Sequence, residues 1–175
     1  MSERRTEPHR ERKKGGRFLP ALCSILGTLI ILSVIALMLP MSVPKLMGYQ
    51  VYNVVSGSMY PAIPQGSMVL VRPVDWSEIA VGDVIAFDSN GSVVTHRVKR
   101  IRVVEGEFVT KGDANEDADI NPVPFDMVIG RVERHIPVLG EITAHAASSL
   151  GKIYLFGVLL CGVLFHVLAN RLREA

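Results

Sequence analysis

The sequence predicts a mainly β domain of short antiparallel strands flanked by two transmembrane helices. Of the 175 residues, 49% are hydrophobic and 21% are charged, and the longest apolar runs lie near the two ends of the chain. Between them, short apolar runs with a period near two are broken by Gly, Pro, Asn and Asp, which is typical of strands joined by tight turns. We therefore expect a basic tail at 1–17, a helix at 18–40, a β domain at 41–149, a second helix at 150–170 and a short tail at 171–175.

The first apolar run, at 18–40, carries no ionisable group except the thiol of Cys23. At about 1.5 Å per residue its length matches the roughly 30 Å hydrocarbon core of a bilayer. The alternative is a cleaved signal peptide, but the run exceeds the usual apolar region of about 7–15 residues and no Ala-x-Ala-like site follows it. We expect an uncleaved membrane anchor.

The second apolar run, at 153–169, is at the short end for a span and carries His166. A transmembrane helix is the favoured interpretation, and an interfacial or bundle helix is the alternative. Arg171 and Arg173 follow closely, so we interpret His166 as a residue of the membrane interface and not as part of a site.

The charges are distributed unevenly between the predicted segments. Seven Lys/Arg and three Glu precede the first run, whereas residues 41–149 hold nine Lys/Arg and thirteen Asp/Glu. The positive-inside rule then predicts a two-pass protein of the cell membrane, with both termini cytoplasmic and the β domain extracytoplasmic. A basic tail beside a span is a topology signal, so we expect no nucleic-acid partner. Cys23 and Cys161 both lie in the apolar runs, and neither a metal nor a cofactor is predicted.

Within the middle segment, strands are expected at 49–55, 67–72 and 83–87, and Asn90-Gly91 is a strong signal for a two-residue hairpin. This turn pairs Ile85 with His96 and puts His96 on one face with Phe87, Val94 and Val98. The other face then carries Thr95, Arg97 and Lys99. A histidine on an apolar face is more often a core residue, so His96 needs partners to indicate catalysis.

Ser58 is a candidate nucleophile at the end of the first predicted strand, in Ser56-Gly57-Ser58-Met59-Tyr60-Pro61. A serine hydroxyl is a weak nucleophile at neutral pH and requires a base, a group that orients the base, and donors for the oxyanion. A lone Ser-Gly-Ser is usually a flexible turn, so this motif is weak by itself.

Four motifs in succession make the signal specific. After residues 56–61 come Gly-Asp-Val-Ile-Ala-Phe at 82–87, Thr-His-Arg-Val at 95–98 and Thr-Lys-Gly-Asp-Ala-Asn at 110–115. This succession, over most of 50–132, resembles type I signal peptidases, and more narrowly the branch with a histidine base found in archaea, the endoplasmic reticulum and some Gram-positive bacteria.

The resemblance implies a role for each matching position. Ser58 corresponds to the nucleophile, and His96 to the general base. Ser56 corresponds to the serine that completes the oxyanion hole together with the backbone N–H of Ser58. Asp119 matches the acid of the triad, and Asp113 matches a supporting residue.

The acidic loop that holds these aspartates leaves alternatives open. Glu116, Asp117 and Asp119 form a crowded acidic stretch that is also compatible with a plain solvated loop. Asp113-x-Asn115-x-Asp117 imitates the start of an EF-hand, but Ala118 and Pro124 occupy the positions of its Gly and Glu, which argues against calcium.

A lysine base is a further alternative for Ser58. Lys99 lies on the opposite strand face from His96, and Lys111 belongs to the Lys-Gly-Asp turn, so histidine is the better candidate. A histidine base predicts activity that falls as pH drops through roughly 6–7, where an ordinary imidazole gains its proton.

The resemblance implies a membrane-bound serine endopeptidase that removes signal peptides from secreted preproteins. Its partners would be the signal-peptide C-region, added as a strand beside the site, the lipid bilayer and the translocation machinery. One rival is an inactive membrane-tethered β domain that holds signal peptides without cutting them. Another is a self-cleaving repressor-type peptidase, which would have a DNA-binding domain where this chain has its first apolar run.

Overall fold

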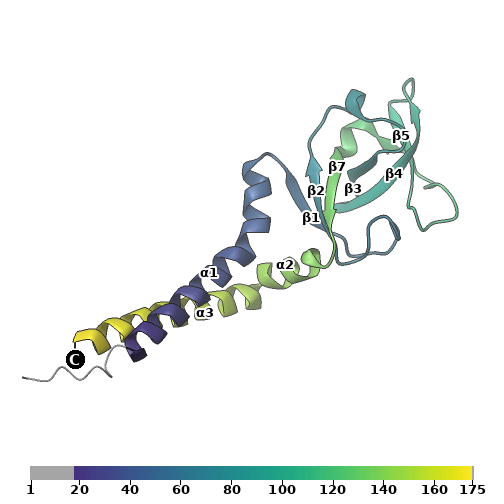
Figure 1. Cartoon of the computed structure of the whole chain (residues 1–175). Coiled ribbons are helices and arrows are strands. Elements are labelled where there is room, and N and C mark those ends of the chain that lie inside the picture. The colour runs from purple at the N-terminus through teal and green to yellow at the C-terminus, as the bar shows by residue number, and fades with distance from the viewer. Residues whose placement is uncertain (1–17, 175) are drawn as a thin grey trace, which may run out of the picture. The chain divides into compact units, whose positions relative to one another are not determined.

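The computed structural model describes residues 18–174, which divide into two compact units. The basic tail predicted at 1–17 and the last residue, Ala175, lie outside the described residues. Figure 1 labels the three α-helices and most of the strands.

The first unit pairs residues 18–35 of α1 (Phe18–Leu46) with residues 154–174 of α3 (Ser149–Glu174). Both helices are long and apolar enough to cross a membrane, in agreement with the prediction. α1 continues past its predicted end at Pro40, with Pro40 and Pro44 both inside the helix.

The contacts between these helices include a close approach at a glycine and a polar contact. A Cβ at Gly27 would lie 2.8 Å from the carbonyl oxygen of Gly162, so the absence of a side chain permits this close approach. One position further along α1, the hydroxyl of Thr28 lies 3.2 Å from His166 Nε2. His166 thus contributes a polar contact between the two helices, a role that the sequence did not predict.

The second unit, residues 36–153, is built on one antiparallel seven-stranded sheet with the order β1-β2-β7-β3-β4-β5-β6. The fold class predicted for this segment is therefore confirmed. Its strands are β1 (Gln50–Asn53), β2 (Met68–Arg72), β3 (Val84–Ser89), β4 (Ser92–Arg102), β5 (Glu107–Lys111), β6 (Val123–Pro124) and β7 (Val128–Ile136).

The β3–β4 hairpin has the register that Asn90-Gly91 predicted. Ser89 pairs with Ser92 and Ile85 with His96. Asn90 and Gly91 have φ values of 55° and 80°, and this pair of left-handed residues matches the right-handed twist of the flanking strands. The turn therefore determines which face of β4 carries His96.

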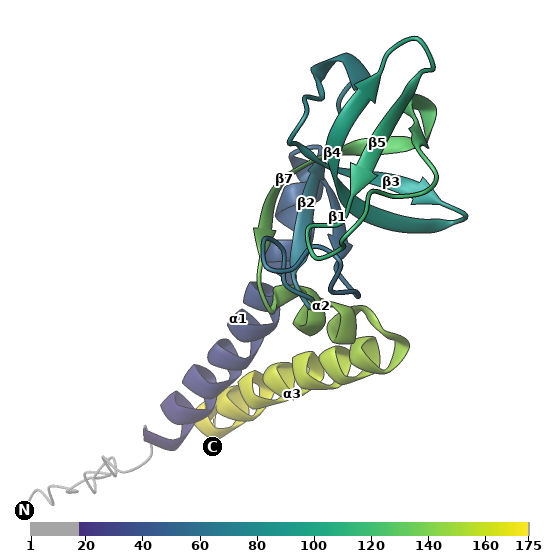
Figure 2. The same ribbon diagram turned by 90° about the vertical axis from the view of Figure 1, so that its right-hand side faces the viewer.

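β4 is paired on both sides for only part of its length. Its residues from Ser92 pair with β3, whereas pairing with β5 begins at Arg97, which lies opposite Lys111. On the β5 side, Ser92–His96 therefore have no strand partner among the described residues. β1 is also an edge strand, because it is the first strand in the order of the sheet. Figure 2 shows β4 and β5 running side by side.

The core consists of two apolar clusters. One lies around β1, β2 and the segment after β1, and contains Val54, Met59, Ile63, Val69, Val71 and Ala86. The other lies under the β3–β4 hairpin and contains Ile79, Ile85, Phe87, Val98, Phe108 and Val123. Beside the second cluster, Trp76 of η2 (Trp76–Glu78) stacks on Phe125 of η3 (Phe125–Met127) with ring centroids 4.4 Å apart. Trp76 thus packs over a turn.

A helix that the sequence did not predict, α2 (Leu139–Ala147), follows β7. A Cβ at Gly140 would collide with the carbonyl of Ser67, so glycine allows α2 to lie directly against the turn that leads into β2. The buried hydroxyl of Thr143 donates to the carbonyl of Leu139 at 2.8 Å. α2 belongs to the same unit as the sheet.

Candidate active site

Ser58 lies in an irregular segment between β1 and β2, and three contacts position it. The next side chain, Met59, is 1% exposed and anchors the segment in the first core cluster. The carbonyl oxygen of Ser58 accepts a hydrogen bond from the backbone N–H of Ala114 at 2.8 Å. The hydroxyls of Ser56 and Ser58 lie 3.4 Å apart. The two serines predicted to act together are therefore neighbours in the structure.

His96, on β4, is bound to Asp119 through its ring. Nδ1 of His96 lies 2.6 Å from Oδ2 of Asp119, and the two side chains are only 11% and 20% exposed. The same carboxylate oxygen accepts a hydrogen bond at 2.6 Å from the hydroxyl of Thr110, which is fully buried. Since a carboxylate is an acceptor, Nδ1 carries the hydrogen and Nε2 is the ring nitrogen that remains for a second partner.

Asp113 binds Arg97 instead of His96. Nε and one terminal nitrogen of Arg97 donate to the two carboxylate oxygens at 2.8 and 2.6 Å, which is a bidentate pair. These hydrogen bonds from the guanidinium lower the pKa of Asp113 and raise the pKa of Arg97. Of the two aspartates that the sequence singled out, only Asp119 contacts the histidine.

One loop, residues 112–119, connects the serine to the histidine. Its Ala114 N–H binds the Ser58 carbonyl, and Asp119 binds His96 while its N–H donates to the carbonyl of Thr110 at 2.8 Å. At Gly112 a Cβ would lie 2.7 Å from the Ser58 carbonyl oxygen, so only glycine allows this close approach. The Lys-Gly-Asp motif therefore has a geometric role beyond its aspartate.

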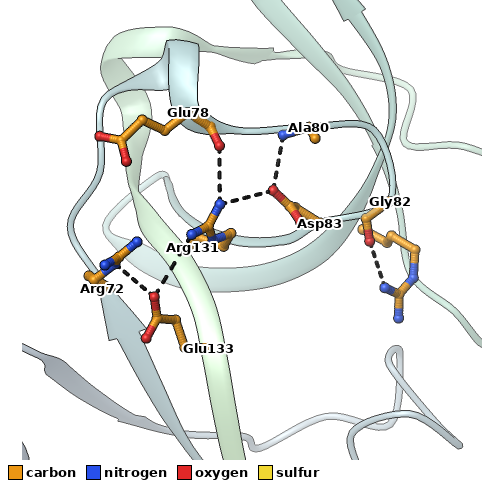
Figure 3. Close-up of polar contacts among 8 residues, drawn as sticks. Arg72, Glu78, Ala80, Gly82, Asp83, Arg131 and Glu133 are labelled. Carbon is orange, nitrogen blue, oxygen red and sulfur yellow. Dashed lines mark hydrogen bonds and ion pairs between the residues drawn. The ribbon is translucent and has the colours of Figure 1, made fainter.

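The opposite side of Arg97 is fixed to the turn before β3. A terminal nitrogen of Arg97 donates to the Gly82 carbonyl at 2.8 Å. In the same turn, Asp83 accepts from the Ala80 N–H at 2.9 Å and lies 3.5 Å from Arg131 of β7 (Figure 3).

Arg131 also reaches Glu133, at 3.8 Å, and Glu133 pairs with Arg72 at 2.7 Å (Figure 3). A continuous set of polar contacts thus runs from β2 and β7 through the turn before β3 to the loop beside His96. This network fixes the turn on which Arg97, and through it Asp113, depends.

Two cavities adjoin at Val94, near the serine and the histidine. The first, of about 190 Å³, lies between residues 52–58 and residues 92–95 and includes Ser56 and Ser58. The second, of about 610 Å³, includes His96, Asp119 and the loop at 115–121. Among residues 18–174, no hydrogen bond joins the Ser58 hydroxyl to His96; its neighbour is Ser56. A base and a nucleophile can be this loosely arranged before substrate binds.

The lysines of the alternative dyad have other positions. Lys99 lies at the irregularity between Val98 and Arg100 in the β4–β5 pairing. The ammonium group of Lys111 donates to the backbone carbonyl of Glu116 at 2.9 Å, which is a structural contact within the loop. Within the described part of the chain, no group of three or more His, Cys, Asp and Glu side chains could hold a metal ion.

Four residues of the site were missed from the sequence. Thr110 and Gly112 lie in the quoted Thr-Lys-Gly-Asp motif, Met59 follows the serine directly, and Arg97 follows the histidine directly. Gly112, Met59 and Arg97 each lie beside a residue that was assigned a role, and Thr110 begins the quoted motif, so position in the motif was the available signal. Side chains alternate between the two faces along β4, so Arg97 was expected on the face opposite His96 and was not assigned to the site.

This chain is similar to several known proteins. Residues 25–135 match the family model described as signal peptidase, peptidase S26. Signal peptidase I W of Bacillus subtilis is 43% identical over 91 residues, which are 49% of this chain and 47% of the relative. The signal peptidase complex catalytic subunit SEC11 of Metarhizium robertsii is 35% identical over 103 residues, 51% of this chain and 59% of the relative. The human signal peptidase complex catalytic subunit SEC11C is 29% identical over 102 residues, which are 51% of this chain and 53% of the relative. The chain spans about half the length of the curated relatives it matches.

Proposed function

Because this chain belongs to the signal peptidase family, peptidase S26, in its histidine-base branch, we propose that it is a membrane-bound serine endopeptidase that removes signal peptides from secreted preproteins. The observation that carries the proposal is the 2.6 Å contact between His96 Nδ1 and Asp119. It supports the tautomer in which Nε2 is unprotonated, the form that a general base requires.

In the proposed mechanism, His96 Nε2 takes the proton of the Ser58 hydroxyl as the Ser58 oxygen attacks the scissile carbonyl carbon. Asp119 orients the ring and stabilises the imidazolium that forms. The Ser56 hydroxyl and the Ser58 backbone N–H stabilise the tetrahedral oxyanion. The protonated His96 then gives its proton to the leaving amine, and water hydrolyses the acyl-enzyme with His96 again acting as base.

The unpaired edge of β4 supports binding of the substrate as an added strand. Residues 92–95 line the cavity of about 190 Å³ from one side, and residues 52–56, at and after the edge strand β1, line it from the other. An extended signal-peptide C-region inserted there could pair with backbone on either flank, which is a recurrent mode of peptide recognition. Its scissile carbonyl would then lie beside Ser58.

The test is Ser58-dependent cleavage of a preprotein by the purified full chain in detergent. We expect a processed product with the wild type and none with Ser58→Ala or His96→Ala. A bell-shaped or acid-limited rate profile that falls through roughly pH 6–7 would support a histidine base. Full activity of the His96→Ala variant would contradict the proposed mechanism. Binding of the preprotein without any Ser58-dependent product would favour the rival function of an inactive signal-peptide-binding domain.

The proposal extends to topology and partners. The charge distribution favours a cytoplasmic N-terminus and an extracytoplasmic β domain, with secretory preproteins, the lipid bilayer and the translocation machinery as partners. A cysteine placed at the exposed Glu105 should then react with a membrane-impermeant thiol reagent added outside intact cells. Labelling only after the cells are broken would contradict this orientation.

A further inference from the structure

The cavity beside His96 is larger than the one beside Ser58. It measures about 610 Å³ and is walled by Phe87, Val94 and His96 of the β3–β4 hairpin on one side. The loop at 115–121 forms its other side. The proposed mechanism uses His96 and Asp119 from this wall and leaves the rest of the cavity without a role.

The chemistry of acyl transfer indicates which part of a substrate lies here. The acyl half of the scissile bond must lie at the nucleophile and the oxyanion donors, which here are Ser58 and Ser56. The leaving nitrogen must lie at the group that protonates it, which is His96. Because Ser56 and Ser58 line the smaller cavity and His96 lines the larger one, the larger cavity lies on the leaving-group side.

The pairing of β4 is compatible with this direction. A substrate strand on the free edge of residues 92–96 cannot continue past His96, because Lys111 of β5 already pairs with Arg97. The substrate chain must therefore leave the sheet at His96. The 115–121 loop, which follows β5, walls the space next to that point.

The charges of this wall are predominantly acidic. Glu116 and Asp117 line the cavity in addition to Asp119, whose carboxylate is already bound by His96 and Thr110. One cationic group also reaches this loop: the ammonium group of Lys111, at the end of β5, donates to the Glu116 carbonyl. Glu116 and Asp117 are exposed, so their influence on a substrate is moderate and sensitive to salt.

We propose, on the basis of the function proposed above, that this cavity receives the first residues of the mature chain and that Glu116 and Asp117 favour basic over acidic side chains there. The wall residues thereby make the cleavage rate depend on the sequence after the cut as well as before it.

The placement is tested by crosslinking on the full-length Ser58→Ala chain, which binds but cannot cut. A preprotein carries a photoreactive amino acid at the second residue after the cut, and the crosslinked peptide is identified by mass spectrometry. We expect crosslinks to residues 115–121. The matched probe, two residues before the cut, should label residues 52–56. Labelling of 52–56 by both probes would overturn the placement.

The charge preference is tested with three preproteins that differ only in Lys, Gln or Glu at the second mature position. Exposed ion pairs of this kind predict a Lys-to-Glu ratio in kcat/KM of roughly two- to tenfold, decreasing with added salt. In the double variant Glu116→Gln/Asp117→Asn the ratio should fall close to one. The control Glu105→Gln removes an exposed carboxylate in the β4–β5 turn, and there the ratio should persist.

Equal rates for all three substrates with the wild-type chain, or a ratio that survives in the double variant, would refute the preference. Either result would leave the proposed peptidase activity intact, since cleavage itself would still depend on Ser58. If the wild-type chain cleaved none of the three substrates, that result would count against the proposed function itself. The crosslinking experiment would still report where the mature segment lies.

Discussion

Thr110→Val removes one hydroxyl from the candidate site with almost no change in volume. That hydroxyl is fully buried and donates at 2.6 Å to the same Asp119 oxygen that accepts from His96. The backbone hydrogen bond from the Asp119 N–H to the Thr110 carbonyl stays available in the variant. The loop therefore keeps its attachment to β5 while the carboxylate loses a donor.

The size of the effect follows from the kind of hydrogen bond that is lost. Hydrogen bonds to charged groups contribute about 1.5–3 kcal/mol, so we expect a fall in melting temperature of about 5–15 °C. An Asp119 carboxylate that is free to rotate would hold the His96 ring less well, and small misplacements of catalytic groups cost about tenfold to a hundredfold in rate. We therefore expect kcat to fall by at least about tenfold.

The assay is preprotein cleavage at a temperature where both proteins are folded, beside thermal unfolding of the β domain followed by circular dichroism. Thr110→Ser keeps the hydroxyl and should retain most of the activity. Thr143→Val removes another buried threonine hydroxyl, whose partners are the carbonyls of Leu139 and Gly140 and the side-chain oxygen of Asn53, and should lower stability without a change in kcat. Wild-type kcat in Thr110→Val would refute the view that this hydroxyl positions Asp119.

Two further predictions concern the loop that joins the serine to the histidine. Arg97 lowers the pKa of Asp113 in the folded chain. The ionised pair therefore stabilises the fold at pH values above the ordinary carboxyl pKa of about 4. This stabilisation is lost as the pH falls through the lowered pKa of the folded chain. The unfolding free energy of Asp113→Asn in urea should thus lie about 1–3 kcal/mol below wild type at pH 7, with the gap closing below about pH 4. Gly112→Ala puts a Cβ 2.7 Å from the Ser58 carbonyl oxygen, and should cost about 1–3 kcal/mol of stability and most of the peptidase rate. Gly157→Ala, where a Cβ meets nothing within 4 Å, should change neither.

The parts of the fold that depend on local chemistry could be predicted from the sequence. Asn90-Gly91 fixes a two-residue turn, and the period of two then determines every pair of the hairpin up to His96. The two apolar runs were recognisable because the length of a membrane span is set by the bilayer.

The parts that depend on distant contacts could not be predicted in this way. α2 has nine residues, and isolated helices of that length are marginal in water, so its formation depends on packing such as that of Gly140 against Ser67. The sequence could not decide which aspartate contacts His96 for a similar reason. Asp113 and Asp119 lie in one loop, and the path of that loop, held by Arg97 and Thr110, decides which carboxylate reaches the ring.

The point where β5 ends has a consequence for inhibition. β5 stops pairing with β4 at Lys111, and the next two residues, Gly112 and Asp113, turn towards Ser58 and Arg97. A β5 that was longer by two or three residues would occupy the edge of residues 92–96 with the chain's own backbone. The chain's own backbone would then compete with the proposed substrate for this edge. A short extended peptide that pairs with this edge and lacks a cleavable bond should have the same effect in trans, and its inhibition should be competitive with preprotein.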